Sequence, residues 1–290
     1  MENNVNIQKV SKGLEYFQVK NEDEKVIGYS VAYGKCVDKN VVVPEVYNNL
    51  PVLKVKEKGF SCKDITAIDL PDTIVEIEDN AFSGSKSLEN IKWSKNLKKI
   101  GDRAFMECCN LNFGGLPNVI TEIGEGAFSN TDANFEGFSC QIKIISDFMF
   151  ETCYLYNFVV PNSVTDINYM AFHNAYINTI VIPDSVNKID EDAFYECKEN
   201  LSAIYCEKKH LDYFKNCMRI YDECDVIEDR FGNLCDLSLG KIHLLIDLYV
   251  RMNDKDVDIE KVKKYKNKYH YINNSWYKHV CVLDEAELIK

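Results

Sequence analysis

The chain has 290 residues, of which 46% are apolar and 28% charged, a globular composition that excludes an intrinsically disordered protein. The formal net charge is −12, and nearly all of it falls in residues 1–214, because residues 215–290 carry 13 Lys and Arg against 14 Asp and Glu. An acidic surface repels phosphate backbones, so no nucleic-acid partner is expected.

The first residues, Met1 to Asn6, show neither a basic segment nor an apolar stretch of the kind that begins a secretory signal. No run of about 18 apolar residues suggests a membrane span. The 12 cysteines are then most simply reduced thiols, which predicts a cytoplasmic protein. If a signal has been removed, the alternative is a secreted or cell-surface protein.

Residues 1–39 come before the first repeat-like segment and are expected to form an N-terminal cap. They contain a strand-like run, Gly28 to Tyr33. A stack of repeats ends in an exposed edge, and an edge of this kind needs a cover.

A small residue followed by Phe recurs seven times in the central part of the chain. The anchor phenylalanines are Phe60, Phe82, Phe105, Phe128, Phe150, Phe172 and Phe194, spaced by 22 or 23 residues. An aliphatic residue lies five positions before each Phe and another lies eight before it. Ahead of these comes an extended segment of the form L-x-x-I-x-I, best seen in residues 65–71, 155–161 and 177–183. A period of this length indicates a repeat solenoid, in which stacking buries the apolar side that one rung cannot bury alone.

The composite repeat, L-x-x-I-x-I-P-x-S-V-x-x-I-x-x-x-A-F-x-x-C, resembles the BspA-type leucine-rich repeat over roughly residues 40–206. The resemblance implies an α/β repeat solenoid with a parallel β-sheet face. It also implies a role in adhesion or interaction. Two copies depart from the pattern, with Gly114 and Glu136 in a slot that should point inward. Because burying an unpaired Glu is costly, we expect a bulge or a poorly formed strand at both.

The third and fifth residues of each L-x-x-I-x-I segment should point outward, by the period-2 rule. These positions form two rows on one face, and the predicted partner-binding residues are Asp69, Asn90, Lys92, Asn157, Val159, Thr179, Val181 and Tyr205. The opposite possibility is that β-branched residues stand here only because they suit exposed strands.

No residue is predicted to be catalytic or to bind a metal, and no cofactor is expected. Cys108, Cys153 and Cys197 each lie three residues after an anchor Phe, so they are expected to be buried, unbridged thiols that pack as small apolar groups. The five histidines form no metal or hydrolase motif, although a Cys–His pair that meets only in the fold stays open.

Residues 207–290 are expected to form a mostly helical unit of no recognised family, docked near Ile204. Helices are predicted over 208–217, 239–252 and 258–271, and strands over 219–225 and 280–283. The acidic run 222–229 and the lysine-rich run 261–268 are both interpreted as solvated surfaces.

These observations favour a non-enzymatic recognition module that binds a protein or polymer ligand through the sheet face. Two alternatives stay open. One is a surface adhesin of the same fold, and the other is an enzyme or effector activity carried by residues 215–290.

Overall fold

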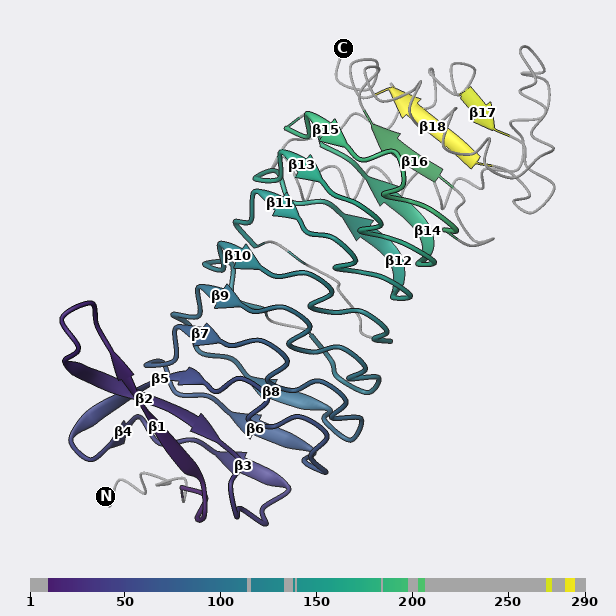
Figure 1. The fold of residues 1–290 in the computed structure, drawn as a ribbon. Coiled ribbons are helices and arrows are strands. Elements are labelled where there is room, and N and C mark those ends of the chain that lie inside the picture. The colour runs from purple at the N-terminus through teal and green to yellow at the C-terminus, as the bar shows by residue number, and fades with distance from the viewer. Residues whose placement is uncertain are drawn as a thin grey trace, which may run out of the picture. The chain divides into compact units, whose positions relative to one another are not determined.

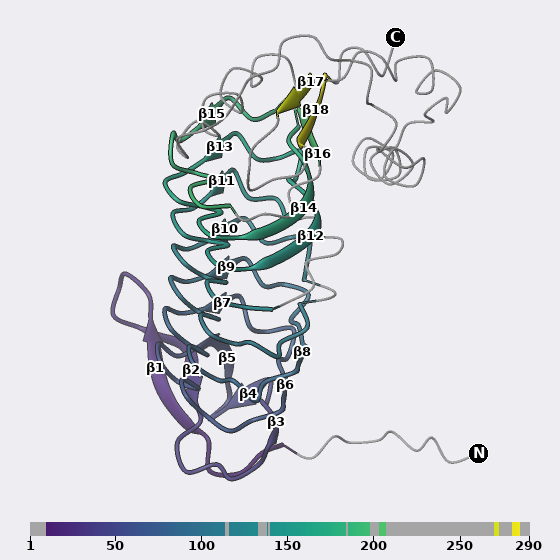
Figure 2. The same ribbon diagram turned by 90° about the vertical axis from the view of Figure 1, so that its right-hand side faces the viewer.

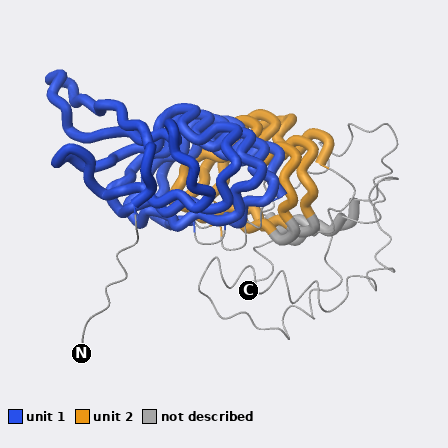
Figure 3. Tube along the Cα trace, turned by 90° about the horizontal axis from the view of Figure 1, so that it is seen from below, with its two compact units in different colours: residues 1–134 blue, residues 135–290 orange. Residues whose placement is uncertain are grey.

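The computed structural model describes residues 10–113, 116–132, 138, 140–183, 185–197, 203–206, 270–272 and 280–284. It divides the chain into two compact units, residues 1–134 and residues 135–290, coloured separately in Figure 3. Each unit is a coil of parallel β-structure, in which successive rungs add one strand to each of two sheets. The predicted repeat solenoid is therefore confirmed.

Unit 1 holds two sheets on opposite sides of its coil (Figure 1). The A sheet of unit 1 consists of the L-x-x-I-x-I strands β3 (Asn40–Val42), β6 (Ala67–Asp69) and β8 (Asn90–Lys92). The B sheet of unit 1 consists of β1 (Glu15–Lys20), β2 (Val26–Ala32), β5 (Leu50–Val55), β7 (Glu76–Ile77), β9 (Lys99–Ile100) and β10 (Glu122–Ile123), with β4 (Val46–Tyr47) paired to β5.

Unit 2 repeats the arrangement, and its two columns of strands are visible in Figure 2. Its A sheet runs in the order β12 (Tyr154–Val159), β14 (Tyr176–Val181), β16 (Ala203–Cys206), β18 (Val280–Asp284) and β17 (His270–Ile272). Its B sheet consists of β11 (Ile144–Ile145), β13 (Asp166–Ile167) and β15 (Lys188–Ile189).

The seven anchor phenylalanines form the core. Six have no exposed surface and Phe194 is 8% exposed, which confirms the prediction from the repeat. In unit 1 the rings of Phe60, Phe82 and Phe105 stack with centroids 5.4 and 5.2 Å apart. In unit 2 the ring of Phe172 stacks on Phe150 at 5.5 Å and on Phe194 at 4.8 Å. Within each unit, equivalent rings therefore fill the same place in successive rungs, so the core of each unit is a column.

Backbone hydrogen bonds fix the register of this column. The amides of five anchors, Phe60, Phe82, Phe105, Phe150 and Phe172, each donate to the carbonyl of the residue before the next anchor, as in Phe60 N to Ala81 O and Phe82 N to Ala104 O, both 2.8 Å. A side chain three residues after the anchor donates to the carbonyl of the previous anchor. Ser85 Oγ reaches Phe60 O at 2.6 Å and Cys108 Sγ reaches Phe82 O at 3.1 Å. A donor at this repeat position satisfies a carbonyl that burial would otherwise leave unpaired.

The expected α/β class is wrong for the described residues, which contain strands and turns but no helix. The reason lies in the turns around each anchor. The residue two positions after every anchor has a positive φ, from +53° to +71°, at Cys62, Gly84, Glu107, Asn130, Thr152, Asn174 and Glu196. A left-handed residue ends any right-handed helix, so the return leg of each rung is a chain of tight turns.

The Gly114 rung is irregular, as expected, because no strand forms over residues 111–113. Phe113, which the pattern placed outward, is instead only 2% exposed. Its ring packs edge-on against Phe105 at 5.5 Å and Phe128 at 4.8 Å. The core thus gains an aromatic ring next to a residue that has no side chain. Gly114 and Glu136 themselves lie outside the described residues.

Strands β1 and β2 cover one sheet at the N-terminal end of unit 1, and Ser11 covers the other. Strand β2 covers the predicted run 28–33 except Tyr33 and pairs in parallel with β5, and β1 pairs with β2 in the antiparallel sense. Ser11 covers β3 on the other sheet, since its amide donates to Val42 O and its hydroxyl accepts from Val42 N, both at 3.0 Å. Both sheets of the first rung are therefore capped.

At the C-terminal side, β18 pairs in parallel with β16 and places Val282 beside Ile204, so the chain does return to this rung. The predicted strand over 280–283 is confirmed. The predicted helix over 258–271 is wrong at its end, because His270 and Tyr271 belong to β17, which hydrogen-bonds to β18. The remaining predictions for residues 207–269, including the mostly helical content, lie outside the described residues.

Replacing Phe105 by Ala should lower the free energy of unfolding by about 3–5 kcal/mol, because it empties a place in the ring column that Phe82, Phe113 and Trp93 also contact. Urea unfolding followed by circular dichroism measures this loss. The matched control is Phe17→Ala, which removes the same ring from a 39% exposed site and should cost far less. Equal losses for the two variants would show that the column is not the core.

Candidate partner-binding surface

The outward face of the unit 1 A sheet carries three of the predicted binding residues. Parallel pairing places Ala67 beside Asn90 and Asp69 beside Lys92, which confirms that these positions form two rows. Asn90 and Lys92 are exposed and Asp69 is partly buried. The Lys92 ammonium lies 3.8 Å from the Asp69 carboxylate, and 68% of the Lys92 side chain is exposed. A long, hydrated contact of this kind holds neither group firmly.

In unit 2 the same rows are in register but differ in exposure. Val159 pairs with Val181, and Val181 pairs with Tyr205. Val159 is partly exposed, whereas Val181 has no exposed surface. The expectation that Val181 is available to a partner is therefore wrong. Its strand is an inner one, flanked by β12 and β16, so Val181 has an in-register neighbour on each side.

The other three predicted residues of unit 2 are placed by their backbones alone. Asn157 pairs with Thr179, and Thr179 with Ala203, so both occupy the third-position row. Tyr205 occupies the fifth-position row. The side chains of Asn157, Thr179 and Tyr205 lie outside what the structure describes.

A pair of stacked tyrosines at the start of β12 and β14 was not predicted. The rings of Tyr154 and Tyr176 are parallel to within 2°, with centroids 4.4 Å apart, and both are partly exposed. The sequence did carry the signal, because the two residues are 22 positions apart and each stands immediately before the first aliphatic residue of its strand. Tyr is enriched at protein interfaces, since it combines a large apolar ring with a polar end.

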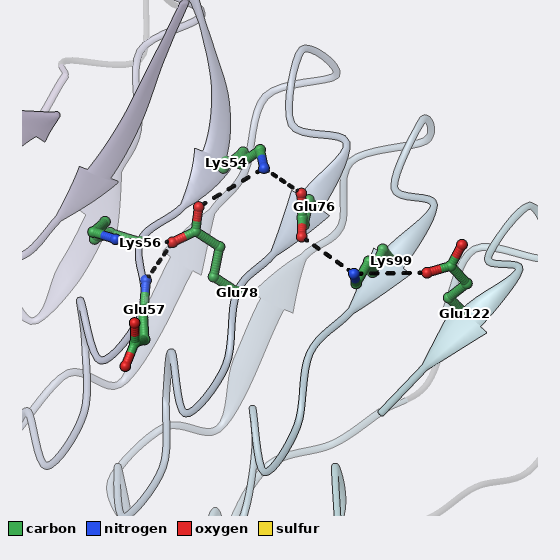
Figure 4. A network of polar contacts seen from close by, with 7 residues as sticks. All are labelled: Lys54, Lys56, Glu57, Glu76, Glu78, Lys99 and Glu122. Carbon is green, nitrogen blue, oxygen red and sulfur yellow. Dashed lines mark hydrogen bonds and ion pairs between the residues drawn. The ribbon is translucent and has the colours of Figure 1, made fainter. Parts of the chain in front are cut away.

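The outward face of the unit 1 B sheet is different, because its charges neutralise one another (Figure 4). Lys54, Glu76, Lys99 and Glu122 stand side by side on β5, β7, β9 and β10, so the charge alternates at every strand. The Glu76 carboxylate lies 2.5 Å from the Lys54 ammonium and 3.7 Å from that of Lys99, which is also 3.7 Å from Glu122.

A second row of the B sheet is also paired. The Glu78 carboxylate lies 3.2 Å from the Lys56 ammonium and 3.9 Å from that of Lys54, and it accepts a hydrogen bond from the amide of Glu57 at 2.8 Å. Opposite charges directly across parallel strands favour the observed register. A charged partner would have to break these contacts, so this face is poorly suited to binding.

The repeat cysteines are structural, as predicted. Cys108, Cys153 and Cys197 are buried. Cys108 and Cys197 use their thiols as donors to the anchor carbonyls of Phe82 and Phe172, at 3.1 and 3.0 Å. Burial raises the pKa of the Cys108 thiol to about 12, so little of it is thiolate at neutral pH. The thiols of seven cysteines are free: Cys36, Cys62, Cys108, Cys109, Cys140, Cys153 and Cys197.

No group of three or more His, Cys, Asp or Glu side chains suited to a metal ion occurs within the described part of the chain. In that same part, no helix is long and apolar enough to cross a membrane. The acidic run 222–229 and the lysine run 261–268 fall outside it.

Residues 53–174 and 143–228 match the family described as the BspA type leucine rich repeat region, in six copies. The chain belongs to this family. Among solved structures, it is 29% identical to a leucine rich cell surface protein of Faecalibacterium prausnitzii, with a TM-score of 0.56 over 68% of this chain. The match covers 53% of the F. prausnitzii protein, so this leucine-rich repeat chain corresponds to about half of that protein.

Two further solved structures are similar to the chain at lower identity. A leucine rich repeat protein of T. pallidum is 22% identical, covers 68% of this chain and 86% of its own, and has a TM-score of 0.43. The pneumococcal vaccine antigen PcpA is 17% identical, covers 68% of this chain and 64% of its own, and has a TM-score of 0.47. No curated protein matches the chain.

Alkylation of the native BspA-type chain by iodoacetamide at mildly alkaline pH should label Cys62, which is exposed, and leave Cys108 and Cys140 unlabelled. The last two are buried, and burial raises the pKa of each thiol to about 12. Peptide mass spectrometry resolves the individual sites. The chain labelled in guanidinium serves as the control, because all three thiols should react there. Labelling of native Cys108 as fast as Cys62 would contradict the buried assignment.

Proposed function

We propose that this chain is a recognition module that binds a protein or polymer partner through the outward face of its A sheets. The observation that carries the proposal is the contrast between the two sheets of unit 1. On the B sheet the charged groups are bound to one another. On the A sheet Asn90 is exposed, and the exposed Lys92 lies 3.8 Å from the Asp69 carboxylate.

The energetic argument concerns what a partner must displace. A ligand on the A sheet of unit 1 meets the long contact between Lys92 and Asp69, whereas a ligand on the B sheet meets a continuous row of ion pairs that includes the 2.5 Å contact between Lys54 and Glu76. In the described residues, the Asn90 amide makes no side-chain hydrogen bond within the chain, so it can donate and accept toward a ligand. Parallel register repeats this polar chemistry from strand to strand, which suits an extended partner.

The proposed contact residues in unit 1 are Asp69, Asn90 and Lys92. In unit 2 they are Val159 and, by register position, Asn157, Thr179 and Tyr205, while the buried Val181 is left out. The partly exposed Tyr154 and Tyr176 join the proposed surface. The acidic charge of the chain supports a partner other than nucleic acid.

The cellular location is also a proposal. Free thiols such as the exposed Cys62 fit a reducing cytoplasm. The similarity to a cell surface protein of F. prausnitzii supports the surface-displayed alternative. Treating intact cells with a protease separates the two, because only a displayed chain would be cleaved.

Two single substitutions that make the same change of charge test the proposed face. Lys92→Glu should weaken binding of a captured partner by about tenfold or more, because it places a carboxylate beside Asp69. Lys98→Glu makes the same change at an exposed residue outside the A sheet and should leave binding unchanged.

Titration calorimetry with the purified partner measures both affinities, and unchanged melting temperatures confirm that both variants are folded. If Lys92→Glu binds as tightly as the wild type and Lys98→Glu loses binding, the binding site does not lie on the A sheet. Loss of binding only on removal of residues 215–290 would favour the effector alternative.

A further inference from the structure

The longest edge strand of unit 1 is β1, which has six residues and lies outermost on the B sheet (Figure 2). Within the part of the chain that the structure describes, β1 pairs with β2 alone. In an antiparallel pair, about half of the residues direct their amide and carbonyl groups away from the partner strand. The outer edge of β1 therefore presents a row of backbone donors and acceptors. The recognition proposal, which concerns the A sheets, does not use this edge.

The chain covers the N-terminal edge of the A sheet, because Ser11 bonds to Val42 of β3 through both its amide and its hydroxyl. The edge of β1 has no such cover among the described residues. Sheets usually protect open edges with charges, prolines or bulges. The four central residues of β1 include no charge and no proline, and its charges stand at its ends, Glu15 and Lys20. The extra residue of the nearby bulge is Ile27 on β2, so β1 itself is continuous.

Apolar side chains gather around this edge. Of the nine large apolar residues that are exposed in the described part of the chain, six lie in residues 10–47. Phe17 of β1 and Ile27 of β2 are each 39% exposed. On the other face of β1, the ring of Tyr16 stacks on Tyr47 with centroids 3.8 Å apart, and Tyr47 is 36% exposed. An added strand would gain apolar contacts on both faces, and exposed apolar patches mark interaction sites.

The edge is held in position by aromatic contacts. Tyr47 of β4 stacks on Tyr16 of β1 and packs edge-on against Tyr29 of β2, with centroids 5.0 Å apart in the second pair. Tyr47 is followed by a tight turn in which Asn48 and Asn49 both have positive φ. Three strands are thus tied together, so binding at the edge of β1 needs little further ordering of the chain.

We infer that β1 is a dimer interface, at which the β1 strand of a second copy of this chain adds in the antiparallel sense and extends the B sheet. A two-fold axis relates the copies. It must run between the two copies of one residue, because side chains that face each other lie on the same side of the sheet. The middle of β1 offers two such centres, Phe17 and Gln18. Pairing uses the edge of both copies, so the assembly closes at two chains.

The sequence of β1 suits a second copy of itself. With the axis at Gln18, Phe17 faces Val19 of the second copy, so two apolar side chains meet. Tyr16 then faces Lys20, which places a cation beside an aromatic ring. With the axis at Phe17, the two phenylalanine rings face each other. Neither arrangement brings like charges of β1 together, although the chain carries a net charge of −12.

Sedimentation velocity of the full chain tests the inference, at concentrations from about 1 μM to about 1 mM. The wild type should change from monomer to dimer as the concentration rises. Gln18→Lys should weaken dimerisation by about tenfold or more, because the two lysines face each other directly or lie diagonally within about 8 Å. Gln18→Glu should do the same. Mixing the two variants should restore the dimer, because opposite charges then meet.

The control is Gln141→Lys, which makes the same change at an exposed residue outside β1 and should leave dimerisation unchanged. Unchanged melting temperatures confirm that the variants are folded. The inference fails if the wild type is monomeric at every concentration, if Gln18→Lys dimerises like the wild type, or if the mixed variants stay monomeric. If the wild type stays monomeric but binds another protein that Gln18→Lys releases, the edge pairs with a strand of that protein and the second copy is excluded.

Discussion

The structure depends on one constraint, which is that every rung must place its anchor phenylalanine over the same point of the next rung. A single rung has an apolar side that it cannot bury, and stacking provides the cover. Buried rings 4.8–6.2 Å apart supply the apolar contact, and the amide of the anchor supplies the hydrogen bond that sets the register. Once this register is fixed, each position of the repeat becomes a column along the unit.

The surface chemistry follows from these columns. A residue type repeated at one position becomes a row of similar side chains, and types that alternate become a ladder, as Lys54, Glu76 and Lys99 show. A ladder of opposite charges stabilises the register, but its charged groups already pair with one another within the chain. A row of exposed side chains with few internal contacts, such as Asn90 and Lys92, remains available to a partner. The same regularity places Glu151, His173 and Tyr195 at one repeat position of three successive rungs.

Much of the fold could be predicted because the repeat is regular. The spacing of the phenylalanines predicted the buried column, and the alternation of the strands predicted rows of outward positions. Cys108 and its equivalents were correctly taken as buried, although their role as donors to the anchor carbonyls needs three-dimensional contacts. The charge ladder and the tyrosine pair could have been found from the same 22- or 23-residue spacing, which was used to find the core and not the surface.

Other features could not be predicted from periodicity. The α/β class was wrong for the described residues because the family resemblance implies a general architecture, whereas the left-handed residues two positions after each anchor are a property of the folded turns. Phe113 is buried although the period-2 rule places it outward, and it lies in a rung whose sequence departs from the repeat. Val181 is buried by the residues that surround its inner strand, and the order of residues within that strand cannot predict this.

The most direct test of the account is to remove one whole rung. Deleting residues 83–105 joins Phe82 to Met106 and keeps every repeat position in phase, because 82 and 105 are successive anchors. The account predicts that this variant still unfolds cooperatively in urea, with a somewhat smaller dependence on denaturant because less surface is exposed on unfolding. Deleting residues 83–93 alone removes about half a rung, puts the anchors out of phase and should abolish cooperative unfolding. Equal stability of the two deletion variants would contradict the claim that the anchor register holds the structure together.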